Sequence, residues 1–150
     1  MRLYTFTNFM LSSIQQGIQS SHVISDLFIK YTNELHDIHT PDAVLYDWAK
    51  THKTMICLNG GNNEALENLY YANLVPIGTS LGLPHTEFHE DEQSLGGIMT
   101  CCGIVVPAYI YESAQTVRGQ DPISRQCMVA PMETAAWELV DLLNQFGLAR

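Results

Sequence analysis

The sequence predicts an α/β fold in which helices cover both faces of a small mixed sheet of four strands. Two features lead to this prediction. Short apolar stretches of strand length alternate along the chain with longer stretches in which apolar residues recur at helical spacing. The stretch 98–106 is almost continuously apolar, which is typical of a central strand covered on both faces. A length of 150 residues suits one domain with an ordinary core, so we expect a single domain over 1–150.

The first strand and the first helix come at the beginning of the chain. Leu3–Thr7 alternates apolar and hydroxyl side chains, as a strand does. Ser12 or Ser13 suits a helix N-cap, because a short hydroxyl side chain there accepts a hydrogen bond from a free backbone N–H. Apolar residues then recur at helical spacing as far as about Thr32.

A second helix and a second strand follow. Thr40 suits an N-cap and Pro41 the first helical position, so we expect a helix that ends near Lys50. Thr54–Leu58 is predicted to be a short buried strand.

The next segment is a turn that leads into a third helix. Asn59–Asn63 consists of glycine and asparagine, which tolerate positive φ, and we interpret it as a plain turn. Glu64 opens the helix, and Asn73 is expected to end it ahead of Pro76.

The second half of the chain supplies the remaining strands. His85–Glu90 alternates like an edge strand, and Ile98–Val106 is the central strand. Residues 107–131 show little periodicity and are expected to form a long irregular loop. An amphipathic helix is predicted from about Met132 to Phe146, within 132–147.

Composition limits the classes of function. Hydrophobic residues make up 46% of the chain and charged residues 15%, which is typical of a globular protein. No apolar run approaches the roughly 20 residues of a membrane helix, so we expect no membrane contact. Met1–Met10 lacks the apolar block of a signal peptide, so a cytoplasmic protein is expected. The net charge of −9 marks an acidic protein and disfavours binding to a phosphate backbone, which depends on Lys and Arg.

The spacing of cysteines and histidines does not suggest a metal or a cofactor, and we expect none. The cysteines are Cys57, Cys101, Cys102 and Cys127. They lack the pairing of a zinc site and are interpreted as buried free thiols. His85 and His89 are four apart on a predicted strand and therefore about 13 Å apart, too far for one metal ion. His36 and His39 fall in a predicted loop.

A polar motif in the first helix leads to a family resemblance. Gln19 and His22 share one helix face, and Gln15 lies one turn before Gln19. The first strand precedes this helix, and Leu45-Tyr46-Asp47-Trp48, a strand and another helix come after it. An acidic turn then occupies 90–94. Over Leu3 to about Pro107, this pattern resembles the type II peptidyl-tRNA hydrolase family, whose first helix reads Lys-x-x-x-Gln-x-x-His. Gln15 occupies the position of the family's Lys.

The resemblance implies the fold of that family and hydrolysis of the ester that joins a peptide to tRNA. That reaction needs an activated water and a stabilised oxyanion. The implied catalytic residues are Gln19, His22, Glu90, Asp91, Ser94 and Thr100. A carboxylate in the turn, or His22, would deprotonate water, and Gln19 with a hydroxyl group would donate hydrogen bonds to the carbonyl oxygen. Glu90 and Ser94 keep the family's Asp and Thr spacing, and a second alignment register places Thr100 at that Thr.

The resemblance also implies tRNA as a partner, which would need cations. Gln15, Lys50 and Lys53 are the predicted substrate-binding residues. Arg118 and Arg125 of the long loop are the other clustered cations.

Two further functions stay open at this level. One is a binding or inhibitory protein that has lost catalysis and engages a protein partner through its acidic surface and the 107–131 loop. The other is a small-molecule enzyme that uses the same cleft. Tyr109, Ile110 and Tyr111 in that loop could form a homodimer contact.

Overall fold

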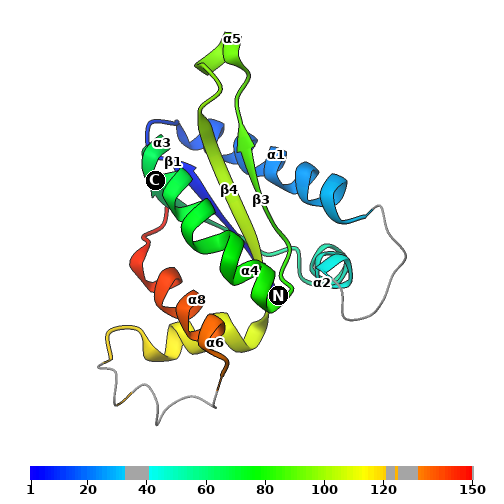
Figure 1. The fold of residues 1–150 in the computed structure, drawn as a ribbon, viewed down its shortest axis with the longest axis vertical. Coiled ribbons are helices and arrows are strands. Elements are labelled where there is room, and N and C mark those ends of the chain that lie inside the picture. The colour runs from blue at the N-terminus through cyan, green and yellow to red at the C-terminus, as the bar shows by residue number, and fades with distance from the viewer. Residues whose placement is uncertain (33–40, 121–123, 125–131, 150) are drawn as a thin grey trace.

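The middle layer of the molecule is a mixed sheet of four strands. The computed structural model, drawn in Figure 1, describes residues 1–32, 41–120, 124 and 132–149. The strands are β1 (Arg2–Asn8), β2 (Met55–Gly61), β3 (His85–His89) and β4 (Met99–Val106), in the spatial order β2-β1-β4-β3. β1 pairs parallel with β2 and antiparallel with β4, and β3 pairs antiparallel with β4. The predicted α/β class and the mixed four-stranded sheet are confirmed.

Helices cover both faces of this sheet (Figure 1). One face carries α1 (Ser13–Tyr31), α2 (Pro41–Asp47) and the π-helical turn η1 (Trp48–His52). The other face carries α3 (Asn63–Leu69), the π-helical turn η2 (Tyr70–Leu74), α4 (Val75–Leu81), α6 (Ala108–Val117) and α8 (Thr134–Gln145). A one-turn helix, α5 (Glu92–Leu95), forms the tip of the β3–β4 hairpin.

The core is divided by the sheet because successive strand residues point to opposite faces. Leu3 and Val105 pack with α1 and α2, whereas Tyr4 and Ile104 pack with α3, α4 and α8. All eight residues of β4 are buried, as predicted for a central strand.

The third helix does not end at Asn73 as predicted, and the helical course continues to Leu81. Pro76 lacks an N–H and would clash with an ordinary α-helical turn before it. The chain relieves this with η2, where the N–H of Val75 donates to the carbonyl of Tyr70, five residues back. The wider turn lets the helix pass the proline instead of stopping.

The prediction of an irregular loop over 107–131 is wrong for residues 108–117, which form α6. Ile110, Ala114 and Val117 are buried at helical spacing. The signal is short, and tyrosines on either side of Ile110 obscured it. Ile110 is fully buried, so it cannot contribute to the suggested dimer contact, whereas Tyr109 is exposed. The predicted C-terminal helix is confirmed as α8.

Several sequence-based expectations fall outside the described residues. These are the N-cap at Thr40, the pair His36 and His39, Cys127, and Arg125. Among the helices that the structure describes, none combines the length and the apolar character needed to span a membrane.

The packing of α1 on the sheet predicts the effect of two alanine substitutions. A Cβ at Gly103 would lie 2.9 Å from Val23 Cγ1 and 3.0 Å from the Tyr4 carbonyl oxygen, so Gly103→Ala should destabilise the fold by about 1–3 kcal/mol. A Cβ at Gly17 meets nothing within 4 Å, so Gly17→Ala should stabilise α1 by about 0.5–1 kcal/mol. Urea unfolding measures both, and a Gly103→Ala protein as stable as the wild type would contradict this packing.

Candidate functional site

Gln19 is the centre of a polar cluster at the end of the sheet where β1 finishes. Its side chain is 5% exposed and lies between the hairpin and the start of β4. Gln19 Nε2 donates to Glu90 Oε1 over 2.5 Å, and Thr100 Oγ1 donates to Gln19 Oε1 over 3.3 Å. The amide is therefore held at both ends. One hydrogen of its NH₂ group satisfies Glu90, and the second is left for another acceptor.

A β-bulge places Thr100 in this cluster. Along the β3–β4 ladder, Phe88 is opposite Cys101 but His89 is opposite Met99, so Thr100 is an extra residue in β4. The bulge interrupts the alternation of the strand. Met99 packs on the α3 side of the sheet, and Cys101 packs on the α1 side. Thr100 reaches Gln19 of α1 and so faces the same side as Cys101.

His22 lies one turn of α1 beyond Gln19. Its ring stacks on Phe88, with centroids 4.4 Å apart and planes within 11°. Phe88 precedes Glu90 by two residues, so successive turns of α1 contact the end of β3 and the residue that follows the strand. The imidazole is exposed. The structure thus brings together Gln19, His22, Glu90 and Thr100.

Asp91 and Ser94 are engaged elsewhere, at the tip of the hairpin. Ser94 donates its backbone N–H to Asp91 Oδ1 over 2.7 Å and its hydroxyl to Asp91 Oδ2 over 2.8 Å. Asp91 is thereby the N-cap of α5, and both residues are exposed. The hydrogen bonds from Ser94 lower the pKa of Asp91 below its usual value. These contacts define a turn-forming pair, which the sequence did not distinguish from a catalytic one.

Gln15 also has a structural partner. It forms a capping box with Ser12, in which Gln15 Oε1 accepts from the Ser12 N–H over 2.9 Å and Ser12 Oγ accepts from the Gln15 N–H. Gln15 therefore fixes the start of α1.

Lys50 and Lys53 lie at the opposite end of the sheet from Gln19. Lys53 ends η1, and the carbonyl of the next residue, Thr54, accepts from the N–H of Leu3 at the start of β1. Gln19 instead lies beside the end of β1, so the length of the strand, about 20 Å, separates these lysines from it. The structure does not bring them to the cluster.

A hydroxyl and thiol network beneath α1 was not predicted. Thr5 Oγ1 and Ser20 Oγ are 3.0 Å apart, and Thr5 also donates to Cys57 Sγ over 3.4 Å. Cys57, Cys101 and Cys102 are free thiols, and burial raises the pKa of Cys101 and of Cys102. Cys57 is half-buried, so among the described cysteines the expectation of burial holds for Cys101 and Cys102.

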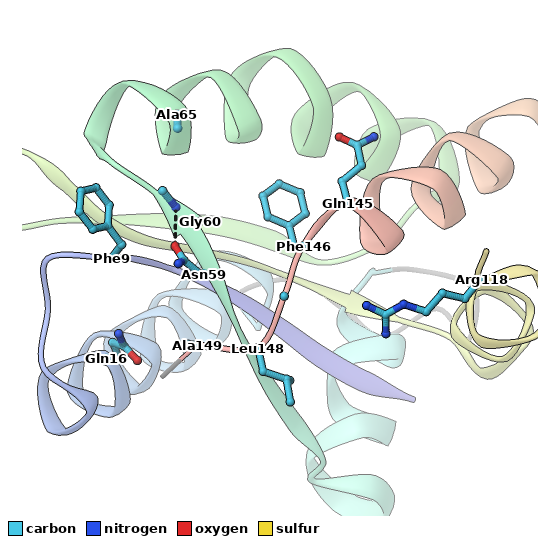
Figure 2. Close-up of a pocket in the computed structure, with 12 residues that line it drawn as sticks. Phe9, Gln16, Asn59, Gly60, Ala65, Arg118, Gln145, Phe146, Leu148 and Ala149 are labelled. Carbon is cyan, nitrogen blue, oxygen red and sulfur yellow. Dashed lines mark hydrogen bonds between the residues drawn. The ribbon is translucent and has the colours of Figure 1, made fainter.

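A concavity opens at the carboxyl ends of β1 and β2. These parallel neighbours lead into α1 on one face and α3 on the other, which creates a crevice between the two connections. A cavity of about 950 Å³ lies there (Figure 2). It is lined by Phe9, Gln16, Asn59, Gly60, Gly61, Ala65, Arg118, Gln145, Phe146, Gly147, Leu148 and Ala149.

The segment predicted as a plain turn forms one wall of this crevice. β2 continues to Gly61, and Asn62 caps α3, which begins at Asn63, one residue before the start expected at Glu64. A Cβ at Gly60 would lie 2.4 Å from Leu66 Cδ2, so glycine allows α3 to pack on β2.

The C-terminal segment forms the other wall. The N–H of Asn59 donates to the Gly147 carbonyl, and the N–H of Ala149 donates to the Cys57 carbonyl, both over 3.0 Å. This pairing joins residues about 90 apart in sequence. No local pattern predicts such a contact, so sequence reasoning missed the crevice.

Comparison with known proteins gives no match for this chain, either among protein-family models or among curated proteins.

The Asp91 cap predicts a pH-dependent local transition. The folded-state pKa of Asp91 is depressed, so the cap is intact at and above the usual aspartate range and is lost as the pH falls through the lower folded value. NMR titration should show the Ser94 amide shifting with a midpoint below about 3.9. The titration should vanish in Asp91→Asn, whose side-chain oxygen still caps. A wild-type midpoint above that value would contradict the cap.

Proposed function

We propose that this protein hydrolyses an ester of the peptidyl-tRNA type, with Gln19, Glu90, Thr100 and His22 as its working residues. The observation that carries the proposal is the amide of Gln19 held between Glu90 and Thr100. The three residues come from a helix, a hairpin and a strand, and the family resemblance suggested each of them from sequence.

Glu90 is the general base in this proposal. Gln19 occupies one of its oxygens, and the half-buried carboxylate keeps a second oxygen that can accept a hydrogen bond from water. Glu90 takes a proton as the water oxygen attacks the ester carbonyl carbon. The same proton then passes to the ribose oxygen when the tetrahedral intermediate collapses.

Gln19 is the oxyanion donor. Its second amide hydrogen points away from the bond to Glu90 and can stabilise negative charge on the carbonyl oxygen. Thr100 is a positioning residue, because its hydroxyl hydrogen is already donated to Gln19 Oε1 and keeps the NH₂ group turned towards Glu90. His22 would contact the substrate beside this group, since its ring is exposed and fixed on Phe88.

A second candidate is a binding or inhibitory protein that keeps this arrangement without turnover. One observation favours it. Gln15, at the position of the family's Lys, is committed to the capping box, and the chain carries a net charge of −9. A phosphate backbone near Gln19 would thus lack the cation that the resemblance leads us to expect.

Two substitutions with the same change in charge test the hydrolase. Glu90→Gln should lower kcat on a peptidyl-tRNA analogue by about 10²–10⁴-fold, because it removes the base. Glu92→Gln, at the exposed tip in α5, should leave kcat unchanged. Absence of turnover by the wild type at micromolar enzyme would reject the hydrolase in favour of the binding protein. Equal losses in both variants would reject Glu90 as the base.

The positioning role of Thr100 has its own test. Thr100→Val removes the hydroxyl that orients Gln19, so kcat should fall by about tenfold while KM changes little. Thr100→Ser keeps the hydroxyl and should restore most of kcat. If Thr100→Ser is as slow as Thr100→Val at equal thermal stability, the hydroxyl does not act through Gln19.

A further inference from the structure

Two arginines line one cavity on the face of the sheet opposite to Gln19. The cavity has a volume of about 230 Å³ and lies between the first halves of β1 and β2 and the helices α6 and α8. Arg2 and Arg118 contribute to its wall, together with Tyr111 and Asn144. None of these residues belongs to the Gln19 cluster.

The charge in this cavity contrasts with that of the whole protein. The chain has a net charge of −9 and only seven lysines and arginines, of which Arg125 and Arg150 lie outside the described residues. Both arginines that the structure describes line this one cavity. Between described residues the only ion pair joins His52 to Asp47, so no described carboxylate is paired with either guanidinium.

One guanidinium group stacks on an aromatic ring, and a turn of the backbone places the other arginine. The guanidinium carbon of Arg2 lies 4.0 Å from the ring centroid of Tyr111, a cation–π contact that leaves the N–H groups at the edge of the plane free to donate. Arg118 follows the last residue of α6, and Gly119 with φ of +78° turns the chain back so that the N–H of Gln120 donates to the Val117 carbonyl. Figure 2 shows the side chain of Arg118 extending from there towards the C-terminal segment.

Asn144 adds a donor to the same wall. Its Nδ2 atom is buried and has no hydrogen-bond partner among the described residues. A buried donor without an acceptor is unfavourable, so an oxygen of a bound group in the cavity would favour a small rotation of the Asn144 amide towards it.

We propose that this cavity binds the carboxylate or phosphate group of a small organic anion. Planar guanidinium groups match the two or three oxygens of such groups, and the Asn144 amide supplies a further donor. The 950 Å³ crevice adjoins this cavity, because Arg118, Phe146 and Leu148 line both. The side chains of Phe146 and Leu148 form a wall against which an apolar or aromatic part of the ligand would pack. The proposal is independent of the proposed hydrolase.

Calorimetric titration with phenyl phosphate, benzoate and inorganic phosphate tests the site. Phenyl phosphate or benzoate should bind the wild-type protein, and the tighter of the two identifies the acidic group. Weaker binding of inorganic phosphate than of phenyl phosphate would show that the apolar wall contributes. Arg118→Gln should weaken binding by about 10-fold to 100-fold, because it removes a charge-assisted hydrogen bond.

Lys50→Gln is the matched control, since Lys50 is exposed, lies at the α2 side of the molecule and loses the same charge. It should change affinity by less than about twofold, as expected for a screened surface charge. Because Arg118 is exposed, both variants should keep the wild-type melting temperature. Failure of both organic probes to bind at millimolar concentration would overturn the proposal. Equal weakening by Lys50→Gln and Arg118→Gln would also overturn it.

Discussion

The close approach of α1 to the sheet at Gly103 is the constraint on which the Gln19 cluster depends. With no side chain at Gly103, Val23 can sit against the backbone of β4. This contact fixes the height of α1 above the strands. At that height Ser20 reaches Thr5, and Gln19 reaches both Thr100 and Glu90. A methyl group at Gly103 would move α1 away from the sheet and lengthen all of these hydrogen bonds together, because they share one rigid helix.

The periodic elements of the fold could be predicted from sequence because their apolar patterns extend over many residues. The 19 residues of α1 and the apolar run of β4 each repeat one pattern over many positions. Structural features that depend on one or two residues could not be predicted in this way. Pro76 normally ends a helix, and only the π-helical turn before it, a tertiary adjustment, keeps the helix going. α6 is short, and its buried positions alternate with tyrosines and polar residues.

The candidate site was partly predictable for the same physical reason. Gln19 and His22 share a face because of helix geometry alone, so sequence could pair them. Thr100 joins them only through a bulge, which reverses the direction that strand alternation gives it. Asp91 and Ser94 are residue types that suit a catalytic site as well as a helix cap, and the choice between the two depends on where the hairpin tip lies. Gln15 is a similar case. The sequence predicted it as a substrate-binding residue, but its side-chain oxygen accepts a hydrogen bond from the backbone N–H of Ser12.

The two edges of the sheet bear on how the protein behaves in concentrated solution. Open sheet edges are templates on which a second chain can add a strand and begin aggregation. Residues 147–149 occupy the outer edge of β2 through backbone hydrogen bonds. At the other edge, Lys30 Nζ and Tyr31 Oη donate to the carbonyl of His85, at the first position of β3. The segment that walls the crevice therefore also shields the chain from edge-to-edge polymerisation, and its removal would expose β2 along with the ligand wall.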